Sequence, residues 1–156
     1  MSPSLDAIAS RLEAEGLVLL GAFHPGPQEV VPPQPDGKPS LTLVLAGNVG
    51  GSLWPQFSAS PEARDAAPDP LDRWSARVIG GLARELGGLA LYPFGGPPYH
   101  PFQRWARRAA PLAPSPLGVL IHPDHGLWHA FRGALAFAAA LPLPPRDARP
   151  SPCDSC

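Results

Sequence analysis

Six side chains that could take part in chemistry lie close together in residues 117–133, which read LGVLIHPDHGLWHAFRG. They are His122, Asp124, His125, Trp128, His129 and Arg132. Imidazole and carboxylate groups bind metals or transfer protons, and a guanidinium binds carboxylates and phosphates. Because no HExxH pairing is present, we favour His122-Pro123 as a turn that shapes a ligand site, with a metal site at this turn as the weaker alternative.

Two strands are expected to position these groups. Residues 117–121 form a short apolar run between prolines, which is typical of a buried strand, and a second apolar run covers residues 127–137. Residues 122–126 have turn chemistry, so the pattern predicts a hairpin with the functional groups at its end. Within such a strand an unpaired Arg132 would be costly, so it should pair with a carboxylate, a carbonyl or a bound anion.

Two further motifs could bind phosphate. Arg104, Arg107 and Arg108 share one face of a short predicted helix at i, i+3 and i+4, and could hold an anion such as a flavin phosphate. The alternative is a solvated basic face whose Trp105 packs into the core. The glycine-rich residues 47–51 follow a strand but lack the P-loop Lys-Ser/Thr, so a tight turn is the better interpretation.

The only two cysteines, Cys153 and Cys156, form a CxxC pair near the end of the chain. We interpret them as metal ligands, the first two of a 4Fe–4S motif, with a thioredoxin-type redox pair as the alternative. A complete cluster needs further ligands, so the chain is expected to be a fragment. The proline-rich tail should then be mobile or held by a neighbour.

The remaining elements predict an α+β fold. Helices are expected over residues 5–15, 69–86 and 101–110, strands over residues 17–23, 41–46 and 89–92, a helical turn over residues 52–58 and a solvated linker over residues 62–69. We predict one domain over residues 1–140 and a proline-rich tail over residues 141–156. The net charge of −1 gives no general attraction to nucleic acid or membranes, and the absence of a signal peptide or long apolar run favours a cytoplasmic protein.

Residues 118–133 carry a resemblance to a known family. The run Gly118-Val-Leu-Ile-His122-Pro123, followed by Gly126, Trp128 and Arg132-Gly133, resembles the cobalamin-processing proteins of the CblC type. The proline-rich run into SPCxxC is similar to bacterial proteins designated ferredoxins, and to the way epoxyqueuosine reductases and reductive dehalogenases join a nitroreductase-related corrinoid domain to Fe–S ligands.

The resemblance implies a nitroreductase-like (flavin reductase) three-layer domain with a mostly antiparallel central sheet. It implies a corrinoid or flavin site in which Gly118 lines the cobalamin and Arg132 binds a thiol substrate. The expected function is that of a redox protein, a corrinoid- or flavin-dependent reductase coupled to a 4Fe–4S segment; a cofactor chaperone or ferredoxin-like electron carrier is the alternative. Expected partners are the cofactor, a redox protein and a second copy in a homodimer. The predicted cofactor-binding residues are Gly118, His122, Pro123, Trp128, Arg132 and Arg104.

Overall fold

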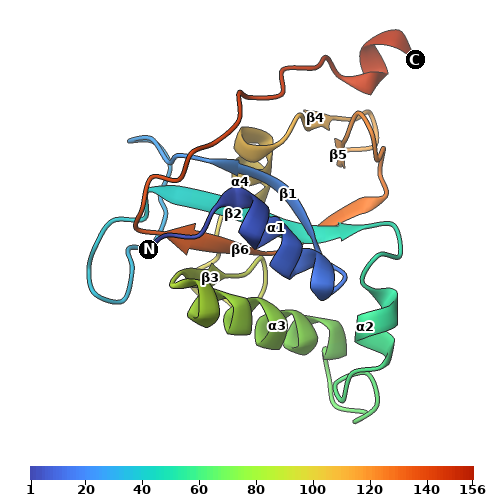
Figure 1. The fold of residues 1–156 in the computed structure, drawn as a ribbon. Coiled ribbons are helices and arrows are strands. Elements are labelled where there is room, and N and C mark those ends of the chain that lie inside the picture. Colours follow the sequence, from blue (N-terminus) through green and yellow to red (C-terminus); the bar gives the residue numbers. More distant parts are fainter.

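The computed structural model describes residues 1–156 and has an α+β fold (Figure 1). The elements are, in chain order, α1 (Leu5–Ala14), β1 (Val18–Phe23), β2 (Thr42–Val49), α2 (Trp54–Ser58), α3 (Pro70–Leu86), β3 (Leu89–Leu91), α4 (Phe102–Ala109), β4 (Ala113–Pro114), β5 (Leu120–Ile121), β6 (His129–Phe137) and a 3-10 turn, η1 (Pro152–Ser155). None of the helices has the length and apolar character needed to cross a membrane.

The central sheet has four strands in the order β1-β2-β6-β3, and every neighbouring pair is antiparallel. This confirms the predicted α+β class and antiparallel sheet. Strands β4 and β5 form a separate two-stranded hairpin. Residues 42–47 of β2 are all buried, although an antiparallel strand with one wet face would alternate. Both faces of the sheet are therefore covered.

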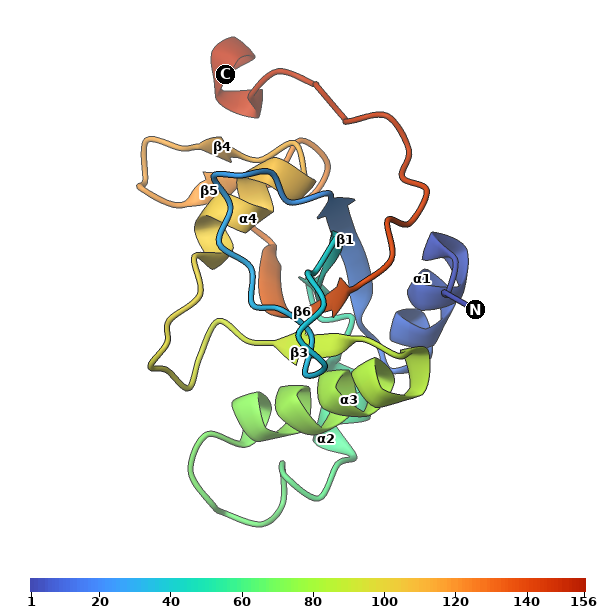
Figure 2. The same ribbon diagram turned by 90° about the vertical axis from the view of Figure 1, so that its left-hand side faces the viewer.

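Two hydrophobic cores lie on the two faces of the sheet and give it three layers. On one face, alternate strand residues such as Val44 and Leu135 pack against α1, α2 and α3. On the other face, Leu45 and Ala134 pack against α4, whose Trp105 is fully buried. Figures 1 and 2 show α3 and α4 on opposite sides of the sheet. Helix α4 is thus held by the sheet, and its outer face is left for solvent.

Local signals explain the two helices on the first face. Ser4 caps α1 by accepting a hydrogen bond from the Ala7 N–H at 3.1 Å, as its sequence position predicts. Helix α3 begins with Pro70 and ends at Gly87, which has a left-handed conformation (φ +72°). Both helices lie within one residue of their predicted bounds.

The predicted hairpin of residues 117–137 is wrong. Only Leu120 and Ile121 form a strand in the first run, and they pair with β4. Leu117 and Val119 are 75% and 51% exposed, so this run is not a buried strand. The second run, β6, lies between β2 and β3 in the central sheet. The partners of β6 are distant in sequence, and the turn before it does not fold it onto β5.

The prediction of a tight turn over all of residues 47–51 is also corrected. Strand β2 continues to Val49, and its register with β6 shifts between Ala46 and Gly47. A Cβ atom on Gly47 would lie 2.0 Å from the Ala130 carbonyl oxygen, so only glycine fits where the two backbones approach. Gly47, at the start of this motif, is therefore part of a β-bulge, and the tight turn begins only after this bulge.

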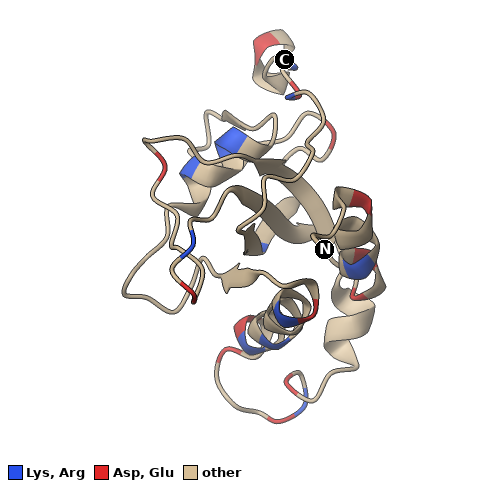
Figure 3. Cartoon of the chain, turned by 60° about the vertical axis from the view of Figure 1, so that its left-hand side comes forward, with Lys and Arg blue, Asp and Glu red and all other residues tan.

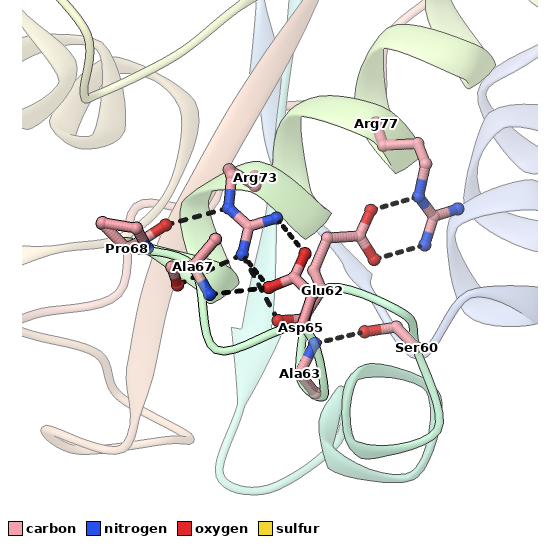
Figure 4. A network of polar contacts seen from close by, with 8 residues as sticks. All are labelled: Ser60, Glu62, Ala63, Asp65, Ala67, Pro68, Arg73 and Arg77. Atoms are coloured by element: carbon pink, nitrogen blue, oxygen red, sulfur yellow. Dashed lines mark hydrogen bonds and ion pairs between the residues drawn. The ribbon is translucent and has the colours of Figure 1, made fainter.

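Residues 63–69 are exposed, as expected of a solvated linker, but the segment of residues 59–69 also carries a polar network in which Glu62 is buried (Figure 4). Glu62 is buried and forms a bidentate ion pair with Arg77 of α3. Arg73 pairs with Asp65 through both terminal nitrogens at 2.7 Å and donates to the Pro68 carbonyl at 2.8 Å. These contacts fasten the segment to the first half of α3.

This network predicts a loss of stability in acid. The hydrogen bonds from Arg77 and Arg73 lower the pKa of Glu62 and that of Asp65 to about 2. Because the folded-state pKa lies below the unfolded value, the stabilisation is complete above about pH 4.5 and is lost as the pH falls toward 2. Melting temperatures measured from pH 6 to pH 2 should show this decline. Glu62→Gln should melt lower at pH 6 and converge with the wild type near pH 2; a constant difference would contradict the assignment.

The tail, from residue 141, runs back over the outside of the domain to η1 (Figure 2). Leu141 is buried, whereas residues 144–150 are all exposed. Arg149 forms a bidentate ion pair with Asp124 at 2.6 and 2.7 Å. This solvent-exposed ion pair links the tail to its own chain.

Candidate functional site

A cleft of about 1000 Å³ lies between α4, the β4–β5 hairpin and the loop that precedes α4. Its charged lining is entirely basic, with no aspartate or glutamate. We call it the arginine cleft; its basic residues are His100, Arg104, Arg107, Arg108 and Arg146. Such a lining favours an anionic ligand.

The sequence of α4 explains why arginines face the cleft. Phe102, Trp105 and Ala106 point into the core beneath the sheet. At helical spacing this leaves Arg104 and Arg107 on the outer face, where both are exposed. In Figure 3 the basic positions of α4 are coloured blue. The predicted basic face and the predicted burial of Trp105 are both present.

Arg108 has a different role from its two neighbours. Its Nε donates to Glu29 at 2.6 Å, and its guanidinium lies 5.2 Å from the centre of the Phe23 ring. The Gly26 N–H and Arg108 lower the pKa of Glu29. Arg108 is therefore neutralised by a half-buried pair and fixes the end of α4 against the loop after β1.

Most arginines of the cleft lack a carboxylate partner, whereas most basic residues elsewhere on the protein have one. Seven of the twelve Lys and Arg residues form an ion pair with a carboxylate, and five do not. Three of those five, Arg104, Arg107 and Arg146, line the arginine cleft. The other two, Arg64 and Arg84, lie elsewhere on the surface. Uncompensated positive charge is thus concentrated at this one cavity.

Gly118 lies at the rim of the same cleft, in the turn of the β4–β5 hairpin. It has φ +77°, and its N–H donates to the Ser115 carbonyl at 3.0 Å. No atom lies within 4 Å of where its Cβ would be. The presence of glycine here is therefore explained by its backbone conformation and not by a close contact. The structure therefore brings together two predicted site residues, Gly118 and Arg104.

His122, His125 and His129 form a separate cluster at the turn after β5. The ring centres of His122 and His125 are 4.4 Å apart, and those of His122 and His129 are 5.9 Å apart. Burial lowers the pKa of His122, and the neighbouring His125 lowers it further; burial also lowers the pKa of His129. His122 and His129 are therefore neutral at pH 7.

The hydrogen bonds of this cluster do not suit a metal. The Asp124 N–H donates to His122 Nδ1 at 3.0 Å, so the proton of the neutral His122 ring is on Nε2 and neither nitrogen is free to bind a cation. No group of three or more His, Cys, Asp or Glu side chains in the chain is placed to hold a metal ion. His122 and the half-buried Pro123 shape the turn, and neither lines the arginine cleft.

Trp128 and Arg132 lie outside the arginine cleft. Trp128 is 79% exposed, and its carbonyl accepts a hydrogen bond from the Gly50 N–H at 2.8 Å. Arg132 pairs with Asp72 of α3 and donates from Nε to Ser75 Oγ at 3.1 Å. The expected carboxylate partner of Arg132 is thus present, and it comes from within the chain.

These partners predict a structural effect for Arg132. Arg132→Ala leaves the half-buried Asp72 without its cation, so the melting temperature should fall by about 3–8 °C. Arg84→Ala, which removes an exposed arginine without a carboxylate partner from the same helix as Asp72, should change it by less than about 2 °C. Thermal unfolding followed by circular dichroism measures both. Weakened ligand binding at an unchanged melting temperature would instead place Arg132 in the ligand site.

Cys153 and Cys156 are free thiols; Cys153 lies in η1, and Cys156 directly follows it. Ser151 begins this turn, and its Oγ accepts a hydrogen bond from the Cys153 N–H at 3.2 Å. Cys153 is half-buried and Cys156 is exposed. The two thiols therefore lie at the surface. The Arg149–Asp124 ion pair attaches their segment to the turn after β5, which carries His122 and His125.

Sequence reasoning missed two members of the arginine cleft. His100 stacks on Trp105 with ring centres 5.5 Å apart, and an aromatic residue two positions before a helix gave no functional signal. Arg146 comes from the tail, whose prolines indicated only an extended spacer.

No protein-family model matches the chain, and no curated protein matches it significantly.

Proposed function

We propose that the arginine cleft binds a phosphate-bearing redox cofactor, with flavin mononucleotide (FMN) as the first candidate. The observation that carries this proposal is the gathering of Arg104, Arg107 and Arg146, none of which has a carboxylate partner. Arginine binds phosphate oxygens through paired N–H donors, and such charge-assisted bonds are about twice as strong as neutral ones. A dianionic phosphate would neutralise most of this charge.

The size of the cleft is compatible with such a cofactor. Small-molecule sites have volumes of roughly 300–1000 Å³, and this cleft reaches the upper end of that range. His100 and Phe102 supply aromatic surface at the cleft, and Leu112 and Leu120 supply aliphatic surface. A flat ring system with a phosphate arm matches this combination.

A corrinoid is the alternative occupant. The resemblance to cobalamin-processing proteins supports it through Gly118, which lies in the cleft. However, cobalamin has a single anionic phosphodiester, which leaves two of the three unpaired arginines uncompensated. Trp128 and Arg132, the other residues that the resemblance singles out, do not line the cleft. The charge balance therefore favours FMN.

A carrier role is the second candidate function. Among the cleft residues, His100 is the one side chain of a type that commonly acts as a general acid or base, and no cysteine, serine, aspartate or glutamate lines the cavity. A site with so few acid–base groups can hold and deliver a cofactor without transforming a substrate. Reduction of the bound flavin by NADH or NADPH would favour a reductase, and binding without turnover would favour a carrier.

The Cys153–Cys156 pair fits only half of a 4Fe–4S site. Such a cluster takes four thiolate ligands, and the described chain has two. We propose that these two thiols contribute to a cluster only together with ligands from another segment or chain. No step of the proposed function depends on the cluster.

The test is a titration of the protein with FMN, riboflavin and cob(II)alamin, followed by flavin fluorescence and visible absorption. FMN should bind at least about 10-fold more tightly than riboflavin, because only FMN carries the phosphate. Its affinity should fall as salt increases, and pyrophosphate should compete. Equal binding of FMN and riboflavin, or no binding of FMN, would overturn the proposal. Tight binding of cob(II)alamin alone would establish the corrinoid alternative.

A further inference from the structure

Arg146 belongs to the tail, yet it lies in the arginine cleft beside the carboxy-terminal end of α4. Its Nη2 donates to the Arg107 carbonyl at 3.4 Å. In a continuing helix that carbonyl would accept from the residue four positions later, which is Pro111 and has no N–H. The sequence therefore leaves an acceptor on α4, and Arg146 uses it.

Few contacts hold this part of the tail. Residues 144–150 are exposed, so little apolar burial fixes their position. Their side-chain links to the domain are the Arg146 hydrogen bond to α4 and the Arg149 ion pair with Asp124. The first link is long and weak, and the second is exposed to solvent.

The Arg146 and Arg107 side chains carry like charges at the same cavity. Neither has a carboxylate partner, and the nearby Asp147 pairs with Arg149. Two guanidinium groups that line one cleft repel each other unless an anion lies between them. The tail thus brings a second unpaired guanidinium to the cleft, in an arrangement that an anionic ligand would stabilise.

We propose that Arg146 is a ligand-binding residue and that an anionic group bound between Arg107 and Arg146 fixes the tail, and with it the Cys153–Cys156 turn, on the domain. This inference rests on the proposed function, because it needs an anion in the arginine cleft. It adds that the binding site is completed by the tail and that occupancy of the cleft controls the position of the two thiols.

Two measurements on the full chain test the proposal. Amide hydrogen exchange of residues 143–156 should slow when FMN is added, as should the reaction of Cys153 and Cys156 with a thiol reagent. Arg146→Gln should weaken FMN binding about 10-fold, leave riboflavin binding unchanged and abolish both protections. Arg84→Gln, which removes an unpaired arginine far from the cleft, is the matched control and should behave like the wild type.

Arg149→Gln separates the two anchors. It should raise thiol reactivity in the free protein, whereas added FMN should still restore protection through Arg146. The inference is overturned if FMN binds the wild type but Arg146→Gln has no effect on affinity, or if FMN slows exchange nowhere in the tail; the proposed function then survives. If FMN does not bind the wild type, the proposed function fails, and the inference, which is tested with FMN as the anion, fails with it.

Discussion

Replacing Arg104 and Arg107 together by glutamate should weaken FMN binding by about 100-fold or more. Each arginine–phosphate interaction contributes roughly 1.5–3 kcal/mol, and the introduced carboxylates add repulsion to the lost attraction. Both arginines are exposed and neither has a carboxylate partner, so no structural contact is lost with them. The melting temperature should therefore change little, which separates this variant from one that fails to fold. Fluorescence titration and thermal unfolding of the same preparation measure both.

The chain offers a matched control for the change in net charge. Arg64 and Arg84 are also exposed and unpaired, but they lie away from the cleft. The double variant Arg64→Glu/Arg84→Glu changes the net charge by the same amount and should retain FMN affinity within about 3-fold at 0.15 M salt, where distant charges are screened. If both double variants weaken binding equally, the arginine cleft is not the site.

Helices were predictable where independent local signals agree. Helix α1 has a serine cap, an apolar stripe and a glycine stop, and α3 has Pro70 at its first position and Gly87 after its last. These signals act within a few residues, so the sequence suffices to locate them. Burial of Trp105 followed in the same way from the spacing of its arginine neighbours.

Strand pairing was not predictable in the same way. The runs at residues 117–121 and 127–137 are both apolar, and apolar character alone does not determine which strand each run pairs with. β6 finds its partners, β2 and β3, 40 or more residues earlier in the chain. The first run instead contributes two residues to a small hairpin, and its apolar Leu117 and Val119 remain exposed.

The candidate site was predictable only in part for a related reason. Arg104 and Gly118 were identified separately, and the hairpin that brings Gly118 to the cleft was not foreseen. Arg146 lies about 40 residues beyond α4, on a segment whose prolines indicated only an extended chain. The one local signal was Pro111, which leaves a helix carbonyl without its usual donor, and such a signal does not specify which donor will replace it.

Gly21→Ala should be strongly destabilising, because the backbone of α4 packs directly against β1 at this residue. Gly21 has φ +142°, and a Cβ atom there would lie 2.2 Å from the Ala109 carbonyl oxygen and 2.7 Å from the carbonyl carbon. The atoms in the way belong to the backbone, so no side-chain rotation relieves the clash. Overpacking of this kind costs about 1–3 kcal/mol, to which the unfavourable φ adds roughly 1 kcal/mol.

Gly37→Ala provides the control that separates the two costs. Gly37 also has a positive φ, of +83°, but nothing lies within 4 Å of its Cβ position, so its substitution should incur only the conformational cost. Chemical denaturation should give a loss of unfolding free energy at least about 1–2 kcal/mol larger for Gly21→Ala than for Gly37→Ala. Because the clash pushes α4 away from β1, and α4 carries Arg104 and Arg107, Gly21→Ala should also weaken FMN binding at temperatures where it remains folded. If the two substitutions destabilise the protein equally, α4 does not depend on this contact with β1. If folded Gly21→Ala binds FMN as tightly as the wild type, the cleft tolerates a displaced α4.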